Sequence, residues 1–323
     1  MKAAVVFEKG SSPQYAEFPE PEITKDGEIL VSVKAASIKN LDRARAGGNH
    51  YSTANNAHQP FIIGTDGVGY MENGNKIYFF SKKGTVAEKA VTELTMTVPI
   101  PEELDFSIAA ALPNAVMGSA MALKFKAGIQ PGHTVLINGA TGITGRIAVQ
   151  VAKLYGARKV IVTGRNEESL KDLLQLGADE VVSLKLNDED FKSKIKNIHS
   201  ETPIDIILDY LWGHSVEMIL SAFKGDGTFS HKMKLVTVGG MSGDSIQLSS
   251  QILRGTDIQI SGSGLGSWTK EESGLLFSEI IPDMFQAAVA GKLKMETEDI
   301  DIQNIEAVWN AGGQAGKRLV VTI

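Results

Sequence analysis

The stretch that decides the fold is residues 134–145, which read TVLINGATGITG. Its first five residues form a short apolar run ending in Asn138, a pattern typical of a buried parallel strand. Gly139, Gly142 and Gly145 follow at intervals of three, and a helical pattern begins there. Turn glycines let a phosphate reach the N–H groups of a helix N-terminus, and the third lets the helix pack close to the strand. We therefore interpret the stretch as a dinucleotide-binding turn, the alternative being a glycine-rich turn without a ligand.

Strand and helix patterns alternate through the middle of the chain. Apolar runs at residues 134–138, 159–163, 180–183, 205–209, 234–238 and 258–261 read as strands. Helical patterns lie between them, the first two at about residues 145–155 and 167–176. This alternation predicts a parallel sheet covered by helices on both faces.

The first hundred residues have a different character. Val- and Ile-rich runs at residues 3–8, 28–36, 62–70, 76–80 and 86–91 are separated by Gly, Pro, Asn and Lys, which is typical of β structure. Residues 47–60 are polar without periodicity and read as a long loop. The last run, residues 318–323, has no partner in the middle region, and we expect it to return to the N-terminal β structure.

Composition limits the classes of function. The chain has 323 residues, a formal net charge of −6 and no cysteine. The acidic balance argues against binding nucleic acid or an anionic membrane surface. No apolar run approaches the length of a membrane span, so we expect none. The lack of cysteine removes disulfides, thiolate nucleophiles and sulfur-ligated zinc, and it fits a cytoplasmic location.

The end of the second strand of the alternating region selects the dinucleotide. Sites for NAD usually carry an acidic residue there, which accepts the ribose 2′-hydroxyl. Here the sequence is Thr163-Gly164-Arg165-Asn166, without a carboxylate. Arg165 is a planar cation suited to a 2′-phosphate, so we predict NADP(H) as the cofactor. The alternative for Arg165 is a solvated surface side chain.

Seven motifs in order carry a resemblance to a known family. They are AASIKNLD at residues 35–42 (followed by Arg45 and Gly47), PFIIGTDGVG at 60–69, GTVAE at 84–88, AAALP at 109–113, the glycine turn, GADEV at 177–181 and GKRLVV at 316–321. With them the chain resembles a zinc-independent quinone oxidoreductase of the medium-chain dehydrogenase/reductase superfamily nearly end to end. The resemblance implies an α/β protein in which a doubly wound parallel sheet (Rossmann) nucleotide domain, residues 116–266, joins a β-rich GroES-like catalytic domain, residues 1–115 and 267–323.

The resemblance also identifies the positions at which zinc-containing members hold their metal. Those members place a cysteine where Lys39 stands and a histidine where Thr65 stands. No set of histidines and carboxylates here has zinc-like spacing, and we predict no metal site. Chemistry through a zinc-bound alkoxide is therefore not expected.

Without a metal, the protein has to supply orientation and electrostatics around the cofactor. Hydride transfer to a quinone or an α,β-unsaturated carbonyl leaves negative charge on an oxygen, which needs a donor. We nominate Lys39, Asn40, Tyr51 and Asp66. Lys39 places an ammonium where the zinc would be, paired with Asp66 or Asp42, and a buried structural ion pair is an equal alternative. Tyr51 matches a tyrosine that resembling proteins place near the nicotinamide, where stacking is favoured over proton donation.

The remaining candidates are assigned to the cofactor. The complete set is Asn138, Gly139, Ala140, Thr141, Gly142, Ile143, Thr144, Gly145, Thr163, Gly164, Arg165, Asn166, Gly239, Gly240, Ser263, Gly264 and Lys317. The later members follow the fifth and sixth strands of the alternating region, and Lys317 is carried over from the resemblance.

The function that we expect is NADPH-dependent reduction of a small electrophilic quinone or enone. Two alternatives stay open: a reductase of enoyl thioesters, and a catalytically idle NADPH-binding sensor or structural protein. We also expect a homodimer that pairs through the edge strand at residues 258–261, because edge strands invite pairing and resembling proteins dimerise there.

Overall fold

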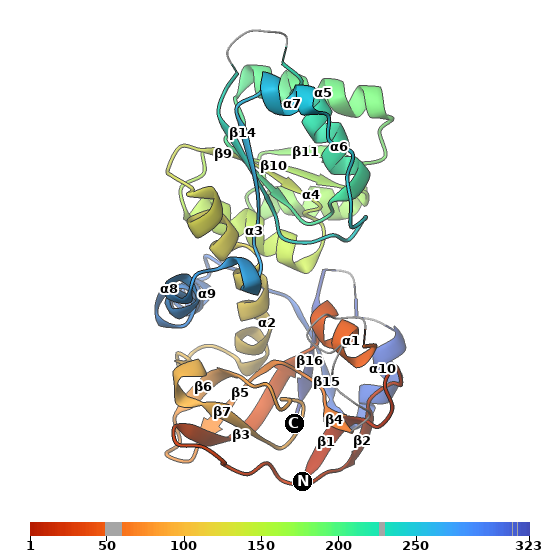
Figure 1. The fold of residues 1–323 in the computed structure, drawn as a ribbon. Coiled ribbons are helices and arrows are strands. Elements are labelled where there is room, and N and C mark those ends of the chain that lie inside the picture. Colours follow the sequence, from red (N-terminus) through yellow and green to blue (C-terminus); the bar gives the residue numbers. More distant parts are fainter. Residues whose placement is uncertain (49–59, 226–229, 312, 315) are drawn as a thin grey trace. The chain divides into compact units, whose positions relative to one another are not determined.

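The computed structural model describes residues 1–48, 60–225, 230–311, 313–314 and 316–323. They form two compact units (Figure 1). The first consists of Met1–Pro113, Phe277–Gly291 and Met295–Ile323, and the second of Asn114–Leu276 and Lys292–Lys294. The predicted division at residues 115 and 267 differs mainly in residues 267–276 and Lys292–Lys294, which lie in the second unit.

The second unit is built on a six-stranded parallel sheet with the order β11-β10-β9-β12-β13-β14. Its strands are β9 (Thr134–Asn138), β10 (Lys159–Gly164), β11 (Glu180–Ser183), β12 (Ile206–Asp209), β13 (Met233–Thr237) and β14 (Ile258–Gly262). The strand order reverses between β9 and β12, the place where sheets of this kind open a ligand crevice at the carboxyl ends of the strands. The predicted doubly wound α/β fold is confirmed.

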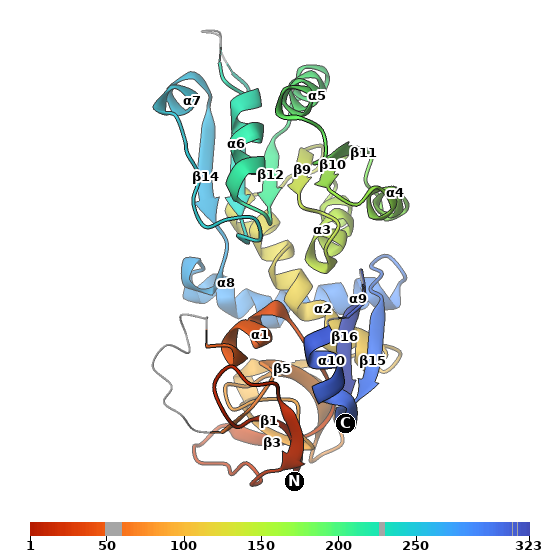
Figure 2. The same ribbon diagram turned by 90° about the vertical axis from the view of Figure 1, so that its right-hand side faces the viewer.

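Helices cover both faces of this sheet. They are α3 (Ile143–Leu154), α4 (Glu167–Gln175), α5 (Asp188–Glu201), α6 (Gly213–Ala222) and α7 (Ser250–Gly255), and α8 (Lys270–Leu275) follows the last strand. The apolar side chains of α5, α6 and α7 form one buried cluster with Leu136, Ile161, Ile207 and Leu235 of the sheet. Helices α3 and α4 pack beside β9, β10 and β11 (Figure 2).

The first unit holds the β structure of both chain ends. One sheet has the order β15-β16-β3-β5-β6-β8 with β7 paired to β3, and a three-stranded sheet has the order β2-β1-β4. The strands are β1 (Lys2–Val6), β2 (Gln14–Glu17), β3 (Glu28–Ser37), β4 (Phe61–Ile62), β5 (Asp66–Met71), β6 (Lys76–Phe80), β7 (Lys89–Glu93), β8 (Thr97–Pro99), β15 (Thr297–Asp301) and β16 (Arg318–Thr322). Helices α1 (Asn40–Ala46), α9 (Ile281–Val289) and α10 (Ile305–Ala311) lie in the same unit.

The last strand of the chain confirms one expectation. β16 pairs antiparallel with β3, so the C-terminus returns to the N-terminal β structure. Other predicted strands were wrong in detail. The run at residues 62–70 divides into β4 and β5, because Gly64 takes a φ of 92° that interrupts an extended strand.

The stretch Phe106–Ala127 is helical. It begins with α2 (Phe106–Met117) and ends with a π-helical turn, η3 (Ala122–Ala127). Its length and mean hydropathy of 1.5 would suffice to cross a membrane, contrary to the expectation from the sequence. However, 72% of the relevant window is buried inside the protein. A core helix has the same length and composition, so this stretch is weak evidence for a membrane span.

Candidate functional site

The carboxyl ends of β9 and β12 are the centre of the candidate nucleotide site. Asn138 and Asp209 are register partners at the last position of the two strands. They mark the point where the strand order reverses, and the glycine turn leaves the sheet there. The fold therefore places the turn at the edge where nucleotide ligands of such sheets bind.

The three turn glycines have different structural reasons. Gly139 has a φ of 83°, and a Cβ on Gly145 would lie 2.5 Å from Ala140 Cα, so the fold itself requires both. A Cβ on Gly142 would meet no heavy atom within 4 Å, and the φ of Gly142 is an ordinary −76°. Nothing in the fold calls for glycine at this position, whereas a phosphate approaching the backbone would.

Gly142 is also the N-cap of α3, and no described side chain caps this helix end. The first N–H groups of a helix have no partner within the helix and carry the positive end of its dipole. An open, uncapped helix N-terminus fits the pyrophosphate of a dinucleotide. The residues of the turn thus fit the cofactor that the sequence predicts.

Two predicted cofactor residues use their side chains inside the protein. Thr163 Oγ1 accepts the Gly139 N–H at 3.1 Å and donates to Asn138 Oδ1 at 2.6 Å. Asn138 Nδ2 in turn donates to Asp209 Oδ1 at 2.8 Å and to Ser215 Oγ at 2.9 Å. These side chains join neighbouring strand ends, and the Gly139 N–H is directed at Thr163 rather than outward.

The end of β10 carries the predicted selector of the 2′-phosphate. Arg165 is exposed, beside Gly164, which is buried next to Thr141. The Asn166 side chain accepts the Ser169 N–H at 2.9 Å and caps α4. Within the described part of the chain, the Asn166 side chain is thus used locally, whereas the exposed Arg165 side chain makes no hydrogen bond or ion pair.

Other predicted residues lie on loops of the same sheet edge, with one exception. Gly239 and Gly240 follow β13, and Ser263 and Gly264 follow β14. The Ser263 hydroxyl accepts the Trp268 indole N–H at 3.1 Å. Lys317, by contrast, belongs to the first unit, directly before β16.

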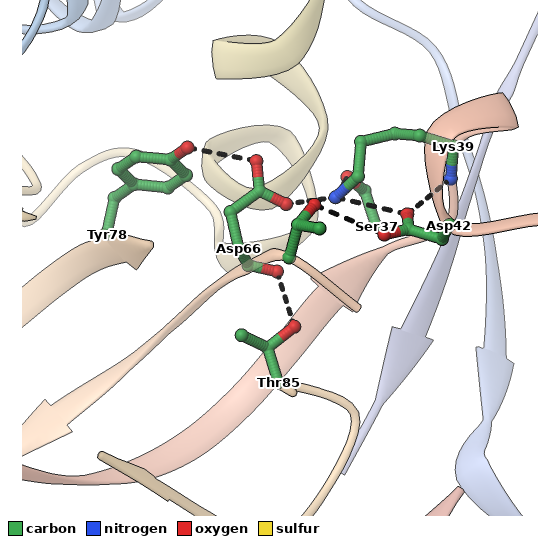
Figure 3. A network of polar contacts seen from close by, with 7 residues as sticks. Ser37, Lys39, Asp42, Asp66, Tyr78 and Thr85 are labelled. Atoms are coloured by element: carbon green, nitrogen blue, oxygen red, sulfur yellow. Dashed lines mark hydrogen bonds and ion pairs between the residues drawn. The ribbon is translucent and has the colours of Figure 1, made fainter. Parts of the chain in front are cut away.

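A second group of polar residues is buried in the first unit (Figure 3). Lys39 Nζ forms ion pairs with Asp66 and, at 3.4 Å, with Asp42, and it lies 3.5 Å from Ser37 Oγ. Both partners that the sequence offered as alternatives therefore contact the same ammonium. Thr65 Oγ1 donates to Asp42 at 3.1 Å, which places Thr65 in the group as well.

Burial shapes the ionisation of this group. Burial raises the pKa of Asp42, and the nearby Lys39 ammonium opposes the rise. Burial, reinforced by Asp66, raises the pKa of Tyr78 well above its usual value, so the phenol stays protonated and donates to Asp66 Oδ2 at 2.9 Å. The buried guanidinium of Arg318 interacts electrostatically with both carboxylates, so two cations balance two anions.

The residues at the zinc positions do not fit zinc. An ammonium at Lys39 and a hydroxyl at Thr65 are not the thiolate and imidazole that bind this metal, and the site already contains a cation. Among the described residues, no group of three potential ligands of the His, Asp or Glu type comes together. Asn40 is exposed at the start of α1, and Tyr51 lies outside the described residues.

Sequence reasoning missed three buried residues of these two groups. Asp209 accepts hydrogen bonds from Asn138, Thr237 and two backbone N–H groups; burial raises its pKa and these bonds oppose the rise. A carboxylate ending an apolar strand was a visible signal for it. Tyr78 and Arg318 carried no such signal, because each lies in a mostly apolar β run and only tertiary structure brings them to Asp66.

Comparisons with known proteins place the chain in a family. A family model described as zinc-binding dehydrogenase matches residues 144–279. The quinone oxidoreductase of Sus scrofa is 30% identical over 261 residues, which cover 77% of this chain and 75% of the relative. That of Rattus norvegicus is 26% identical over 344 residues, covering 99% and 98%.

A solved structure agrees with these relatives. The quinone oxidoreductase of Thermus thermophilus, whose complex with NADPH has also been determined, is 27% identical, and the match covers 100% of both chains with a TM-score of 0.82. The sequence matches and the structure match thus indicate the same family over nearly the whole chain. The protein is an NAD(P)H-dependent oxidoreductase of the quinone oxidoreductase kind, and it belongs to the medium-chain dehydrogenase/reductase superfamily.

Proposed function

We propose that the protein is an NADPH-dependent, zinc-independent reductase that transfers a hydride to a quinone or an α,β-unsaturated carbonyl. The observation that carries the proposal is Gly142, a glycine that the fold does not require at an open and uncapped helix N-terminus. The relatives named as quinone oxidoreductases, one of them solved with NADPH, support the same assignment.

The second unit binds the cofactor in this proposal. N–H groups at the start of α3 receive the pyrophosphate, and Arg165 receives the 2′-phosphate that distinguishes NADPH from NADH. Gly239, Gly240, Ser263 and Gly264 border the rest of the dinucleotide, and Lys317 remains a predicted phosphate contact. When bound, NADPH supplies the hydride.

The first unit stabilises the oxygen that becomes negative. Lys39 has three N–H donors, directed at Asp66, Asp42 and Ser37. The 3.5 Å contact to Ser37 Oγ is the longest of these, and it is the one that a substrate oxygen can replace. In this proposal Asp66 orients the ammonium and Asn40 donates a hydrogen bond to the substrate. Tyr51, which lies outside the described residues, keeps its predicted role of stacking. The alternative for Lys39 is a purely structural ion pair, which turnover of a Lys39→Met variant distinguishes from this role.

A panel of substrates tests the proposal. NADPH oxidation is followed by absorbance with quinones, enals, enones and enoyl thioesters. We expect turnover with quinones or enones. Turnover confined to enoyl thioesters would replace the proposed substrate class, and tight NADPH binding without turnover of any compound would indicate a sensor or structural protein.

We further propose that the protein is a cytoplasmic homodimer. β14 pairs with β13 on one side, and no described strand pairs with its other edge. An unpaired edge can extend the sheet into a second copy of the chain.

A further inference from the structure

Asp209 is a buried carboxylate at the last position of β12, and no described cation forms an ion pair with it. Its two oxygens accept hydrogen bonds from uncharged N–H and O–H donors instead. Oδ1 accepts from Asn138 Nδ2 at 2.8 Å and from the Leu211 N–H at 3.1 Å, while Oδ2 accepts from the Trp212 N–H at 3.0 Å and Thr237 Oγ1 at 3.1 Å. A buried charge of this kind is costly unless it is fully hydrogen-bonded, so its presence calls for a reason.

The hydrogen bonds that lead away from Asp209 run in a single direction. The Gly139 N–H donates to Thr163 Oγ1, the Thr163 hydroxyl donates to Asn138 Oδ1, and the Asn138 amide donates to Asp209. Asn138 cannot be turned over, because its oxygen would then face the carboxylate. These hydrogen bonds form a relay from Gly139 through Thr163 and Asn138 to Asp209. The charge on Asp209 therefore fixes the orientation of every group in this relay.

The same carboxylate also holds a strained loop. Trp212 has a φ of 57° and a ψ of −162°, and it is the only described residue other than glycine with a positive φ. Such a conformation costs free energy and persists only when its surroundings hold it. Both oxygens of Asp209 accept the Trp212 N–H, and the neighbouring Leu211 side chain lies where a Cβ of Gly139 would be.

The loop after β13, which carries Gly239 and Gly240, contacts the loop before α6. The Ser242 N–H donates to Leu211 O at 2.7 Å, and the hydroxyl of Thr237, at the end of β13, reaches Asp209. Asp209 thus joins the glycine turn, the loop before α6 and the loop that carries Gly239 and Gly240. Two of these segments, the glycine turn and the loop that carries Gly239 and Gly240, are ones to which the proposed function assigns cofactor contacts.

We infer that Asp209 is a positioning residue for the nicotinamide cofactor: it sets the glycine turn and the loops after β12 and β13 in the arrangement that binds NADPH, without touching the cofactor. The inference rests on the proposed function. It distinguishes Asp209 from a carboxylate that only stabilises the sheet.

The matched variants are Asp209→Asn and Asp205→Asn. Asp205 precedes the same strand at its other end, where it accepts the Thr134 N–H at 2.7 Å and contacts His231 at 2.8 Å. An amide at position 209 presents an N–H group toward backbone N–H donors and breaks the relay. Asp209→Asn should raise the Kd for NADPH about tenfold or more. Asp205→Asn should lower the melting temperature but leave the Kd for NADPH within about twofold of the wild-type value. Asp205 lies at the opposite end of β12 from the proposed site, and changes at distant positions are largely independent.

The steady-state parameters give a second readout. Misplaced loops weaken binding, so Asp209→Asn should raise the KM for NADPH while kcat at saturating NADPH stays within about twofold. A fall in kcat with an unchanged KM and Kd would assign Asp209 to the chemical step and overturn the inference.

A second pair of variants covers the case in which Asp209→Asn does not fold. Thr163→Val removes the hydroxyl in the middle of the relay, and Thr134→Val removes a buried hydroxyl at the opposite end of the neighbouring strand β9. Thr163→Val should weaken NADPH binding and Thr134→Val should not. If Asp209→Asn folds, the double variant Asp209→Asn/Thr163→Val should have about the same Kd for NADPH as the single variant that binds more weakly, because both changes interrupt the same chain of hydrogen bonds. A Kd raised by the product of the two single effects would contradict this coupling.

The two proposals fail differently. A wild-type protein that does not bind NADPH overturns the proposed function. The positioning role alone is overturned if the wild type binds NADPH and both Asp209→Asn and Thr163→Val have a Kd within twofold of the wild-type value. If Asp209→Asn does not fold, an unchanged Kd in Thr163→Val overturns it.

Discussion

At the scale of single residues, Arg165 is the side chain that we propose selects between two cofactors that differ by one phosphate group. Its guanidinium is exposed at the end of β10, where no described carboxylate forms an ion pair with it. Arg165→Ala should reduce the preference for NADPH over NADH by about tenfold or more, because a charge-assisted contact to the 2′-phosphate is lost. The ratio of the two Kd values, measured by fluorescence titration, checks this. Arg158→Ala, at the other end of the same strand, is the control, and an unchanged ratio in Arg165→Ala would leave Arg165 a surface residue.

Lys39 is the second residue whose charge can be tested directly. Lys39→Met leaves Asp42 and Asp66 buried without the ammonium, and unfolding free energy should fall by about 3–5 kcal/mol, the usual effect of removing one partner of a buried ion pair. Urea denaturation measures the loss, with the exposed Lys34→Met as the control. Turnover measured on the folded fraction separates the two interpretations: a strong loss supports oxyanion stabilisation, and normal turnover leaves a structural ion pair.

The residues that sequence reasoning found and missed differ in a physical way. The geometry of the glycine turn and the exposed position of Arg165 after a strand end were predictable from local sequence. The role of Arg165 stays a prediction. Lys39 was found through its position in a motif, but its simultaneous pairing with Asp42 and Asp66 required the fold. Asp209 was overlooked since its role depends on four strand ends that lie far apart in the sequence.

At the scale of elements, the junction of β9 and α3 depends on close backbone packing. A Cβ on Gly145 would lie 2.5 Å from Ala140 Cα, so Gly145→Ala must displace the helix or the turn. We expect a loss of stability of about 1–3 kcal/mol, as for other overpacked sites, and a lower melting temperature in calorimetry. Gly264→Ala is the control, because a Cβ there meets no heavy atom within 4 Å. An unchanged melting temperature in Gly145→Ala would show that this approach is not tight.

Elements that the sequence did not predict have weak local signals. β15 reads TEDID, with acidic residues at three of its five positions, and it exists because it pairs in parallel with β16. β2 and β8 have only four and three residues. The central parallel strands β9, β10 and β12 were found nearly to the residue, because they are almost fully buried and read as continuous apolar runs.

At the scale of the whole molecule, the free edge of β14 predicts assembly. We expect a symmetric dimer at micromolar concentration in light scattering, formed by pairing of two such edges. Ile260→Pro removes an N–H group and should disfavour continuous pairing there. A monomeric wild-type protein would contradict the dimer and leave the fold and the cofactor site unaffected.

The most direct test of the account is calorimetric titration of the wild-type protein and Gly142→Ala with NADPH. A methyl group at this position meets no protein atom within 4 Å, so the variant should fold with an unchanged melting temperature. It should obstruct the approach of the pyrophosphate to α3, and the Kd for NADPH should rise about tenfold or more. Absence of NADPH binding by the wild type, or equal binding by Gly142→Ala, would contradict a phosphate site at the glycine turn.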